Sequence, residues 1–545
     1  MSTVDDYVQA VVHRSREPME PVEFQPNWRD QPWRHKVYEN VRRFPLPVDS
    51  PALLGGFSDG LYGQIPYGGR SFSLESLAAM LRHSYGLLAR RLRVDGNHNH
   101  DGRAAYQHAL WSRGTASGGG LYPCEVYWVS GSRGPMQPGV YHYSPPHHAM
   151  QRLLSGDVVE RVRAAVPDHL EMSDTDQFLL VSVRFWKNAF KYASFCYHCV
   201  TMDLGCLLQT WQLWARADGM VFRPALWFDE PALNHLLGLD SLTESVMAVV
   251  PVPWDHAVDE PVGDEPAAPA SSGAPDGETV KAAVNRATTE RSRNVIQFTQ
   301  VEEVHRATLA GNGPRPDPSS LASAAVNGPG YEASVRLPSP EVERLDVNLA
   351  GVLRARRSSF GLFARTPPLS DSDLGTILSV AGHGRHLHSD LRYADGTPRL
   401  TRLAMFANHV DGVTPGAYNY DPDHHALQPL PGEALSPFLQ LHYSLNNYNL
   451  EQVAAVLAVV ARPQAAIEGS GARSYRLVNA EVGAIAQTVY LAAATLGIGC
   501  GAALGFDNVA FAERLGIDDS DEWPLLLLML GHERADQADV VDRLV

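Results

Sequence analysis

The chain has 545 residues, of which 44% are hydrophobic and 19% are charged, and its formal net charge is −16 at pH 7. This length is too great for one hydrophobic core, so we expect at least two domains. The excess of negative charge argues against nucleic acid as a partner, because a surface that binds phosphates needs an excess of lysine and arginine.

The sequence begins with the acidic segment MSTVDD, lacks the basic-then-apolar pattern of a secretion signal, and has no apolar run near the roughly 18 residues of a membrane span. Five cysteines in so long a chain do not make a disulfide framework. We therefore expect a cytoplasmic protein without a membrane partner. Residues 1–50 are predicted to be an N-terminal extension, and the first domain is predicted at 51–254.

A glycine-rich turn is predicted at 117–120, where Ser-Gly-Gly-Gly directly precedes an apolar stretch. Because glycine has no side chain, the backbone amides of such a turn can approach a planar or anionic ligand closely. A plain loop before a strand explains the same residues, and for the turn alone it is the simpler explanation.

Lys191 and Tyr192 stand before a predicted helix at 200–217, whose Leu, Ala, Gln and Thr residues continue without proline until Gly219 follows. A lysine beside a phenol can lower the pKa of the phenol, or act as a base itself when it is desolvated. The alternative is a surface lysine next to a packed tyrosine.

Cys196, Cys199 and Cys206 include a Cys-Tyr-His-Cys spacing that zinc sites use. A zinc site of this kind usually has a second pair of ligands, and none is visible in the sequence. The three cysteines also run into an apolar helical stretch, where free cysteine packs well. We therefore predict no metal site.

Between 255 and 345 the chain is rich in Pro, Ala, Ser and Asp, a composition typical of a linker, which we expect to be interrupted by a helix near 278–310. The second domain is predicted at 346–545. Near its start, Arg356-Arg357-Ser358 suits a phosphate, because arginine presents forked donors and stays charged. In isolation, a solvated basic turn is the simpler explanation.

The two halves of the chain repeat each other, beginning with a tyrosine-rich strand. The segment GVYHYSPPHHAMQ at 139–151 matches GAYNYDPDHHALQ at 416–428, which lies 277 positions further on. Each is predicted to be a strand followed by a polar turn. Such a match over a long segment indicates tandem duplication.

The repeat continues through the helix and the last strand of each half with a shift of 278 positions. Residues from Asp203 to Gly219 match residues from Glu481 to Gly497, and Leu-Gly-Leu-Asp at 237 matches Leu-Gly-Ile-Asp at 515. Each half is therefore predicted to be an α+β unit, with helices at 200–217 and 479–496 and terminal strands at 246–252 and 525–530.

This combination resembles the SagB/McbC-type azoline dehydrogenases of the FMN-binding nitroreductase superfamily. The resemblance covers most of both halves and includes the stretch Ser-Gly-Gly-x-Leu-Tyr-Pro-x-Glu-x-Tyr at 117–127 and the strands Gly-x-Tyr-x-Tyr at 139–143 and 416–420. It implies FMN as the cofactor and Lys191 and Tyr192 as catalytic residues. The residues that it assigns to cofactor binding are Arg356, Arg357, Ser358, Ser117, Gly118, Gly119, Leu121, Tyr122, Gln487, Leu496, Gly497 and Gly499.

The halves have lost different parts of the family pattern. Lys191 and Tyr192 correspond to Gly469 and Ser470, so the second half lacks that pair, while the first half lacks Arg-Arg-Ser. Superfamily dimers build each flavin pocket from both subunits. The resemblance therefore implies tandem FMN-dependent nitroreductase-like domains that form an intramolecular pseudo-dimer with one composite pocket.

The opposite pairing of the halves is expected to bind no flavin. Its phosphate would face Gly69-Arg70-Ser71, where a lone arginine replaces the pair, and its ring would face Arg399 and Arg402 in a stretch without glycines. Two further departures from the family are Phe195 and Phe360, which stand where many relatives have arginine.

In the family, FMN oxidises a thiazoline or oxazoline of a modified peptide to the thiazole or oxazole. The resemblance implies an azoline-containing precursor peptide as substrate and a cyclodehydratase complex, with a YcaO-type protein and its partner, as the assembly. The chemistry needs a base for the ring Cα proton and a flavin N5 that takes hydride from Cβ. Lys191 or Tyr192 supplies the base, and their adjacency leaves the choice open because neighbouring groups titrate as a pair.

Two alternatives stay open at this stage. One is another flavin reaction, by an NAD(P)H-dependent nitro- or quinone reductase or by an oxidase of carrier-bound azolines. The lack of a clear GxGxxG turn weakly disfavours a nicotinamide requirement. The other is a non-catalytic scaffold subunit of a cyclodehydratase complex, which would need neither Lys-Tyr nor Arg-Arg-Ser. Further homo-oligomerisation also stays open.

Overall fold

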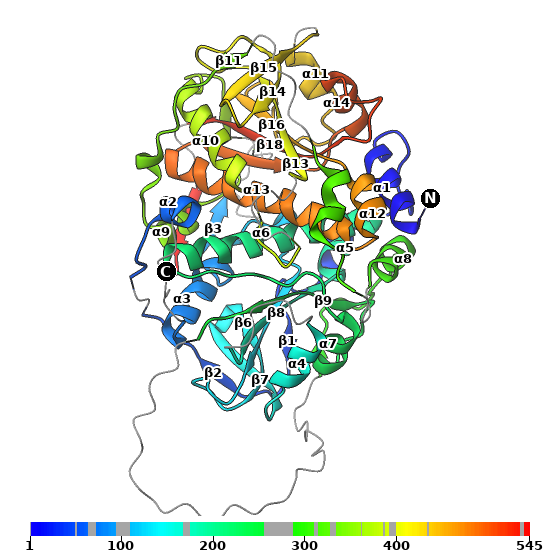
Figure 1. Cartoon of the computed structure of the whole chain (residues 1–545), viewed down its shortest axis with the longest axis vertical. Coiled ribbons are helices and arrows are strands. Elements are labelled where there is room, and N and C mark those ends of the chain that lie inside the picture. Colours follow the sequence, from blue (N-terminus) through cyan, green and yellow to red (C-terminus); the bar gives the residue numbers. More distant parts are fainter. Residues whose placement is uncertain are drawn as a thin grey trace, which may run out of the picture.

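The protein has a mixed α/β fold in which helices lie between two antiparallel sheets (Figure 1). The structure is a computed structural model, and it describes residues 2–49, 52–63, 72–93, 109–166, 175–254, 287–309, 314–326, 334–360, 362–384, 387–391, 399–432, 435–534 and 539–545.

The first half forms a six-stranded sheet with the order β2-β7-β6-β5-β8-β9. Its strands β5, β8 and β9 are buried along almost their whole length because helices cover both faces of the sheet. The bounds are β2 (Arg43–Pro45), β5 (Cys124–Ser130), β6 (Gly139–Ser144), β7 (Ala149–Ser155), β8 (Gln177–Arg184) and β9 (Glu244–Pro251). The strands predicted at 139–143 and 246–252 are thus confirmed as β6 and β9.

The second half forms a sheet with the order β11-β15-β14-β13-β16-β18-β12, and β17 also pairs with β18. Its run from β15 to β18 repeats the order of β7 to β9, which is the topology that the sequence repeat predicts. The bounds are β11 (Val335–Arg336), β12 (Phe363–Ala364), β13 (Thr401–Ala407), β14 (Gly416–Asp421), β15 (Ala426–Leu430), β16 (Ala455–Ala461), β17 (Gly499–Ala503) and β18 (Trp523–Glu533).

Helices fill the space between the sheets and cover their outer faces. In the middle layer, α6 (Cys196–Ala217) packs on α13 (Ser474–Leu496), which confirms the two predicted long helices. Helices that pack on this pair are α2 (Phe57–Tyr62), α3 (Leu74–Ser84), α5 (Trp186–Tyr192), α9 (Leu349–Ala355), α10 (Asp371–Gly384) and α12 (Pro463–Ser470). The outer faces are covered by α4 (Val159–Ala165) and α7 (Glu230–Leu237) on one sheet and by α11 (Leu435–Leu441) and α14 (Asn508–Leu515) on the other.

The two central helices touch at equivalent positions, so that a shift of 278 residues turns the contact of one helix into that of the other. A Cβ atom at Gly205 would collide with the carbonyl oxygen of Ala480, and one at Gly483 would collide with that of Met202. Such reciprocal contacts are those of a twofold-symmetric interface. The two glycines let the backbones of α6 and α13 approach closely, so helix pairing depends on the glycine that the repeat keeps in both halves.

Helix α13 is also the one helix in the described parts of the chain that is long and apolar enough for a membrane span. Of its most apolar window, 94% is buried inside the protein. Its apolar character is therefore explained by its place between two sheets. The cysteines at 196, 199 and 206 are buried on α6, and Cys206 Sγ lies 3.1 Å from the carbonyl oxygen of Gly483.

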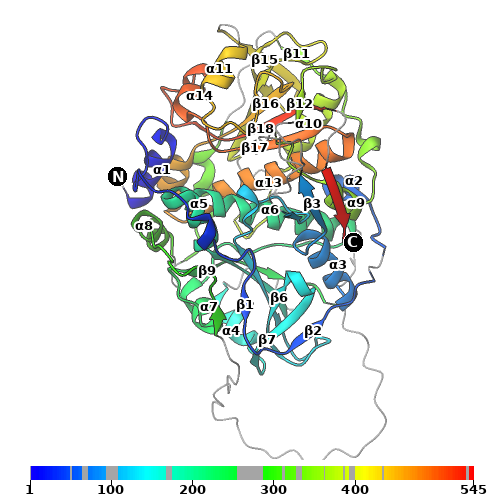
Figure 2. The ribbon, with the colours of Figure 1, turned by 180° about the vertical axis from the view of Figure 1, so that it is seen from behind.

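Segments outside the two sheets connect the halves. The C-terminal strand β19 (Asp539–Arg543) pairs with β3 (Ala89–Arg93), which pairs with β4 (Ala109–Ser112), so the end of the second half joins a sheet of the first (Figure 2). In the N-terminal extension, α1 (Thr3–His13) packs on α12 and α14 of the second half. The extension and the second half therefore share buried surface.

The segment predicted to be a linker contains regular structure within residues 287–345. Strand β10 (Thr288–Thr289) pairs with β1 (Val37–Tyr38), and helix α8 (Thr299–Thr308) packs on α1 and α6. Val301 and Val304 are buried on the packed face of α8. The helix lies within the predicted range 278–310, and residues 255–286 lie outside the described part of the chain.

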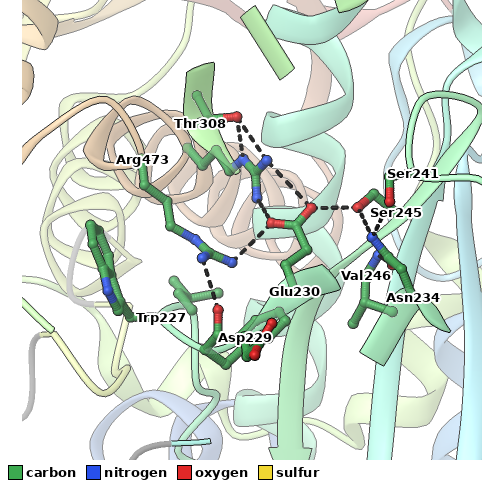
Figure 3. Close-up of polar contacts among 12 residues, drawn as sticks. Trp227, Asp229, Glu230, Asn234, Ser241, Ser245, Val246, Thr308 and Arg473 are labelled. Atoms are coloured by element: carbon green, nitrogen blue, oxygen red, sulfur yellow. Dashed lines mark hydrogen bonds and ion pairs between the residues drawn. The ribbon is translucent and has the colours of Figure 1, made fainter. Parts of the chain in front are cut away.

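A buried polar cluster joins the halves beside α8 (Figure 3). Glu230 on α7 accepts hydrogen bonds from Arg473 at 3.0 Å and from Arg476 at 2.6 Å, both in the second half. Arg476 also donates to Thr308 of α8 at 2.7 Å, and Ser245 donates to Glu230. One carboxylate thus ties three parts of the chain together.

Candidate active site

The glycine-rich turn is a short 3-10 helix, η2 (Gly118–Gly120), between β4 and β5. Gly119 and Gly120 both have φ of 63°, a left-handed conformation that residues with a side chain rarely adopt. Leu121 and Tyr122 follow with buried side chains. The turn therefore requires the glycines that the sequence places there.

Lys191 and Tyr192 lie directly against this turn. They end helix α5, and Lys191 Nζ lies 4.8 Å from the centre of the Tyr192 ring. A Cβ atom at Gly119 would lie 2.7 Å from Tyr192 Oη and 3.0 Å from Lys191 Nζ. Burial lowers the pKa of Lys191, and burial raises the pKa of Tyr192 well above its usual value.

Asp203, on helix α6, holds the other side of the turn. Its carboxylate accepts hydrogen bonds from Ser117 Oγ at 2.6 Å and from the Gly118 N–H at 2.8 Å. Ser117 Oγ in turn accepts from the Tyr122 N–H at 2.9 Å. Burial raises the pKa of Asp203 to about 7, against the lowering effect of its two hydrogen bonds.

The sequence did not single out Asp203 as a site residue. Its only sequence signal is the acidic residue that the repeat keeps at both positions, Asp203 and Glu481.

Gln487 brings the second half to the same turn. Its Oε1 accepts from the Ala116 N–H at 2.8 Å, and its Nε2 donates to the Gly114 carbonyl oxygen at 3.2 Å. Gln487 is fully buried on α13. The segment before the glycine turn is therefore fixed by a side chain from the other half.

Arg356 also reaches across to this segment. Its Nε donates to the Gly114 carbonyl oxygen at 2.8 Å and its Nη2 to that of Arg113 at 2.9 Å. The side chain is buried, and its guanidinium lies 5.4 Å from the centre of the Tyr490 ring. Two N–H donors of Arg356, which the sequence predicted to bind a phosphate, are therefore hydrogen-bonded to the backbone of the first half.

A cavity of about 140 Å³ lies next to Arg356, between the start of the second half and the end of α13. It is lined by Ala355, Arg357, Ser359, Tyr490, Ala494, Gly497, Ile498, Gly499, Cys500 and Glu533. Three predicted cofactor residues therefore face one cavity. Ser358 lies beside it, with its Oγ 2.9 Å from Tyr490 Oη, and Leu496 ends α13 just before the cavity.

Two polar atoms at this cavity have no hydrogen-bond partner among the described residues, Ser359 Oγ and Glu533 Oε1. Arg357 forms an ion pair with the other carboxylate oxygen of Glu533. Gly497, with φ of 73°, has open space where a Cβ atom would point. The cavity thus presents the hydroxyl of Ser359, the backbone of Gly497 and the guanidinium of Arg357. In this structure the guanidinium is paired with Glu533.

The N-terminal extension covers the chain just after Lys191 and Tyr192, a contact that the sequence did not indicate. Tyr7 Oη donates to the Ser194 carbonyl oxygen at 2.8 Å. The guanidinium of Arg14 lies 4.5 Å from the centre of the Phe195 ring. An arginine from the extension therefore packs on Phe195.

In the described part of the opposite pairing, aromatic and paired side chains stand at the corresponding positions. At the position that corresponds to Cys500, the first half has Phe222, which is buried and lies 5.1 Å from Phe72 between ring centres. Arg402 is held by Glu522 and Asn419, and Arg399 pairs with Asp423. The segment Gly69–Ser71 lies outside the described residues.

Comparisons with known proteins identify the family. The sequence pattern of the Nitroreductase family matches residues 353–532. A provisionally named nitroreductase of Methanocaldococcus jannaschii is 30% identical over 196 residues, which cover 36% of this chain and 94% of that protein. The chain therefore belongs to the nitroreductase family, whose members are oxidoreductases that generally use a flavin, FMN.

Solved structures extend the similarity of fold to both halves. A crystal structure of a provisionally named nitroreductase from Anabaena variabilis has a TM-score of 0.70 and 22% sequence identity, and covers 98% of this chain and 100% of that one. The E. coli microcin synthetase McbBCD complex with truncated pro-MccB17 bound matches with a TM-score of 0.27 and 17% identity, over 43% of this chain and 86% of that one. A TM-score this low supports no conclusion about activity.

Proposed function

We propose that this protein is an FMN-dependent dehydrogenase that oxidises thiazoline or oxazoline rings of a peptide to thiazoles or oxazoles. The observation that carries the proposal is the contact of Lys191 and Tyr192 with Gly119. It puts a proton acceptor and a phenol beside a turn that has no side chains of its own. A planar ligand resting on that turn meets both groups, and a scaffold subunit has no need of this arrangement.

The residues present fit a flavin mononucleotide. The buried Ser359 hydroxyl without a partner among the described residues, and the guanidinium of Arg357 at the same cavity, suit a phosphate. Arg357 and Ser359 would hold that phosphate, and the turn at 117–120 would take the ring. The phosphate has to compete with Glu533, which pairs with Arg357.

The flavin, when bound, supplies the acceptor for the hydride that leaves the ring Cβ. The side chains of the protein remove the proton on the ring Cα, which is acidic because of the adjacent C=N and carbonyl groups. Burial lowers the pKa of Lys191, so a larger fraction of its amine is neutral and able to act as base. Burial raises the pKa of Tyr192, so its phenol stays protonated. We therefore assign Lys191 Nζ as the base and Tyr192 Oη as a hydrogen-bond donor that orients the ring.

An azoline within a peptide is formed by cyclodehydration of a cysteine, serine or threonine residue. The substrate is accordingly an azoline-containing precursor peptide, supplied by a cyclodehydratase complex of a YcaO-type protein and its partner. Oxygen or another acceptor would take up the two electrons removed from the ring, so no nicotinamide requirement is expected. The family resemblance of the motifs at 117–127, Lys191-Tyr192 and Arg356–Ser358 supports this choice of substrate.

The test is a visible spectrum of the purified protein followed by incubation with an azoline peptide. We expect a flavin spectrum and, by mass spectrometry, the loss of two hydrogen atoms for each ring oxidised. Steady oxidation of NADPH with a nitroaromatic or quinone, without ring oxidation, would indicate a reductase instead. A protein that stays colourless after incubation with FMN would indicate a scaffold.

A further inference from the structure

Asp203 is a buried carboxylate that the assigned chemistry does not use. It is 6% exposed, and among the described residues it forms no ion pair. Its contacts are the hydrogen bonds from Ser117 Oγ and the Gly118 N–H. A buried charge without a cation is costly, so its presence beside a functional turn calls for a role.

We propose that Asp203 is the positioning residue of the active site, whose carboxylate holds the glycine turn against Lys191 and Tyr192. The inference rests on the proposed function, in which the turn takes the flavin ring. Asp203 binds the first residues of the turn, Ser117 and Gly118. Ser117 Oγ in turn accepts a hydrogen bond from the Tyr122 N–H at the end of the turn. Both ends of the left-handed segment are thereby fixed to helix α6.

The position of Gly119 shows why this tie matters for the chemistry. A Cβ atom at Gly119 would already lie within 3.0 Å of both Tyr192 Oη and Lys191 Nζ. The backbone of the turn therefore contacts the Lys191 amine and the Tyr192 hydroxyl and fixes their position. A shift of the turn changes the space between its backbone and the base, and a misplacement of about 1 Å costs on the order of 10²-fold in rate.

The thiols and phenols that interact electrostatically with Asp203 are neutral near neutral pH. Burial raises the pKa values of Cys199 and Cys206 on α6, of Cys124 on β5, of Tyr85 after α3 and of Tyr192 on α5. Lys191, which lies against Gly119 of the turn, has its pKa lowered by burial. Asp203 itself has its pKa raised to about 7 by burial, so its charge changes in the physiological range.

Protonation of Asp203 weakens the tie. The ionised carboxylate accepts both hydrogen bonds, whereas the protonated form keeps one carbonyl oxygen as a good acceptor and must donate its own proton. Ser117 Oγ donates to the ionised carboxylate, so a proton on that carboxylate oxygen removes this acceptor and requires the hydroxyl to rotate. We therefore expect the turn to loosen as the pH falls below about 7.

The second half provides a matched control for this role. Glu481 stands at the position that corresponds to Asp203 and accepts from Thr401 Oγ1 at 2.7 Å. The sequence of the second half has no Ser-Gly-Gly at the corresponding place. Glu481→Gln therefore removes a buried acid at the equivalent position without touching the proposed site.

The experiment compares wild type, Asp203→Asn, Ser117→Ala and Glu481→Gln as full-length, FMN-loaded proteins. Asparagine keeps the volume and the acceptor for the Gly118 N–H but has no charge to gain or lose. With an azoline peptide, we expect kcat of Asp203→Asn to fall about 10²-fold with little change in KM. Its rate should also lose the part of the rise near pH 7 that comes from Asp203, while the rise that comes from deprotonation of Lys191 remains. Ser117→Ala should change kcat in the same direction, and Glu481→Gln should keep the wild-type profile.

Hydrogen exchange of the backbone segment 116–124 gives a second readout that needs no substrate. After correction for intrinsic rates, we expect faster exchange in Asp203→Asn at pH 8, and faster exchange in wild type at pH 6 than at pH 8. Unchanged exchange in Asp203→Asn, or a wild-type pH profile of kcat in that variant, would overturn the proposal. If exchange responds as expected but no protein oxidises the azoline, Asp203 positions the turn and the proposed reaction is wrong.

Discussion

The buried cluster around Glu230 yields the sharpest prediction for stability. Glu230 is fully buried on the first half, while its partners Arg473 and Arg476 belong to the second. Glu230→Gln keeps the volume of the side chain but removes the carboxylate that pairs with two buried guanidiniums. Breaking a buried ion pair in this way costs about 3 to 5 kcal/mol, a large share of the roughly 5 to 15 kcal/mol that stabilise a typical protein.

Urea unfolding followed by far-ultraviolet circular dichroism measures this loss. The control is Glu160→Gln, which removes a 3.0 Å ion pair with Arg163 in which the glutamate side chain is 84% exposed. We expect the control to cost at most about 1 kcal/mol, because water and salt screen an exposed pair. If Glu230→Gln costs no more than the control, the cluster does not hold the halves together as argued.

The pH dependence of this loss has a definite sign. Burial alone would raise the pKa of Glu230, but the charges of Arg476 and Arg473 outweigh it and lower the pKa. A carboxyl with a lowered folded pKa contributes stability that is fully present above its unfolded pKa and is lost as the pH falls through the folded value. The gap between wild type and Glu230→Gln should therefore be full at pH 7 and shrink below about pH 4. A gap that stays constant down to pH 3 contradicts this reasoning.

The remaining predictions concern the site. Lys191→Ala and Tyr192→Phe should retain FMN but lose about 10² to 10⁴-fold in turnover, and a smaller loss in both would place the proton transfer elsewhere. Arg357→Ala should lower the FMN content measured by absorbance, since it removes a charged donor at the cavity. Glu533→Gln should raise FMN retention by releasing that donor, and a fall in both variants would show that the ion pair itself shapes the site. Flavin released by denaturation should approach one per chain, because the buried Phe222, in contact with Phe72, stands where Cys500 lines the cavity of the other pairing, and a value near two under saturating FMN refutes a single site.

The sequence by itself determined the plan of the molecule. The repeat predicted two α+β units, and the sheets follow with the same strand order because apolar periodicity and turn residues act locally in each half. The repeat also keeps a glycine at one register position, Gly205 and Gly483, although only the structure shows that α6 and α13 meet there. The glycine turn at 117–120 could also be found in advance, since only glycine adopts its backbone conformation without strain.

Only the tertiary structure decided which of these residues meet. Asp203 reaches Ser117 across 86 residues of chain, and Arg356 reaches Gly114 across 242, so neither partner is visible in local spacing. Arg357 looked like a free phosphate ligand, yet folding sets Glu533 against it. A sequence gives residue types and their periodicity, whereas burial, charge pairing and the pKa of Asp203 depend on how distant elements pack.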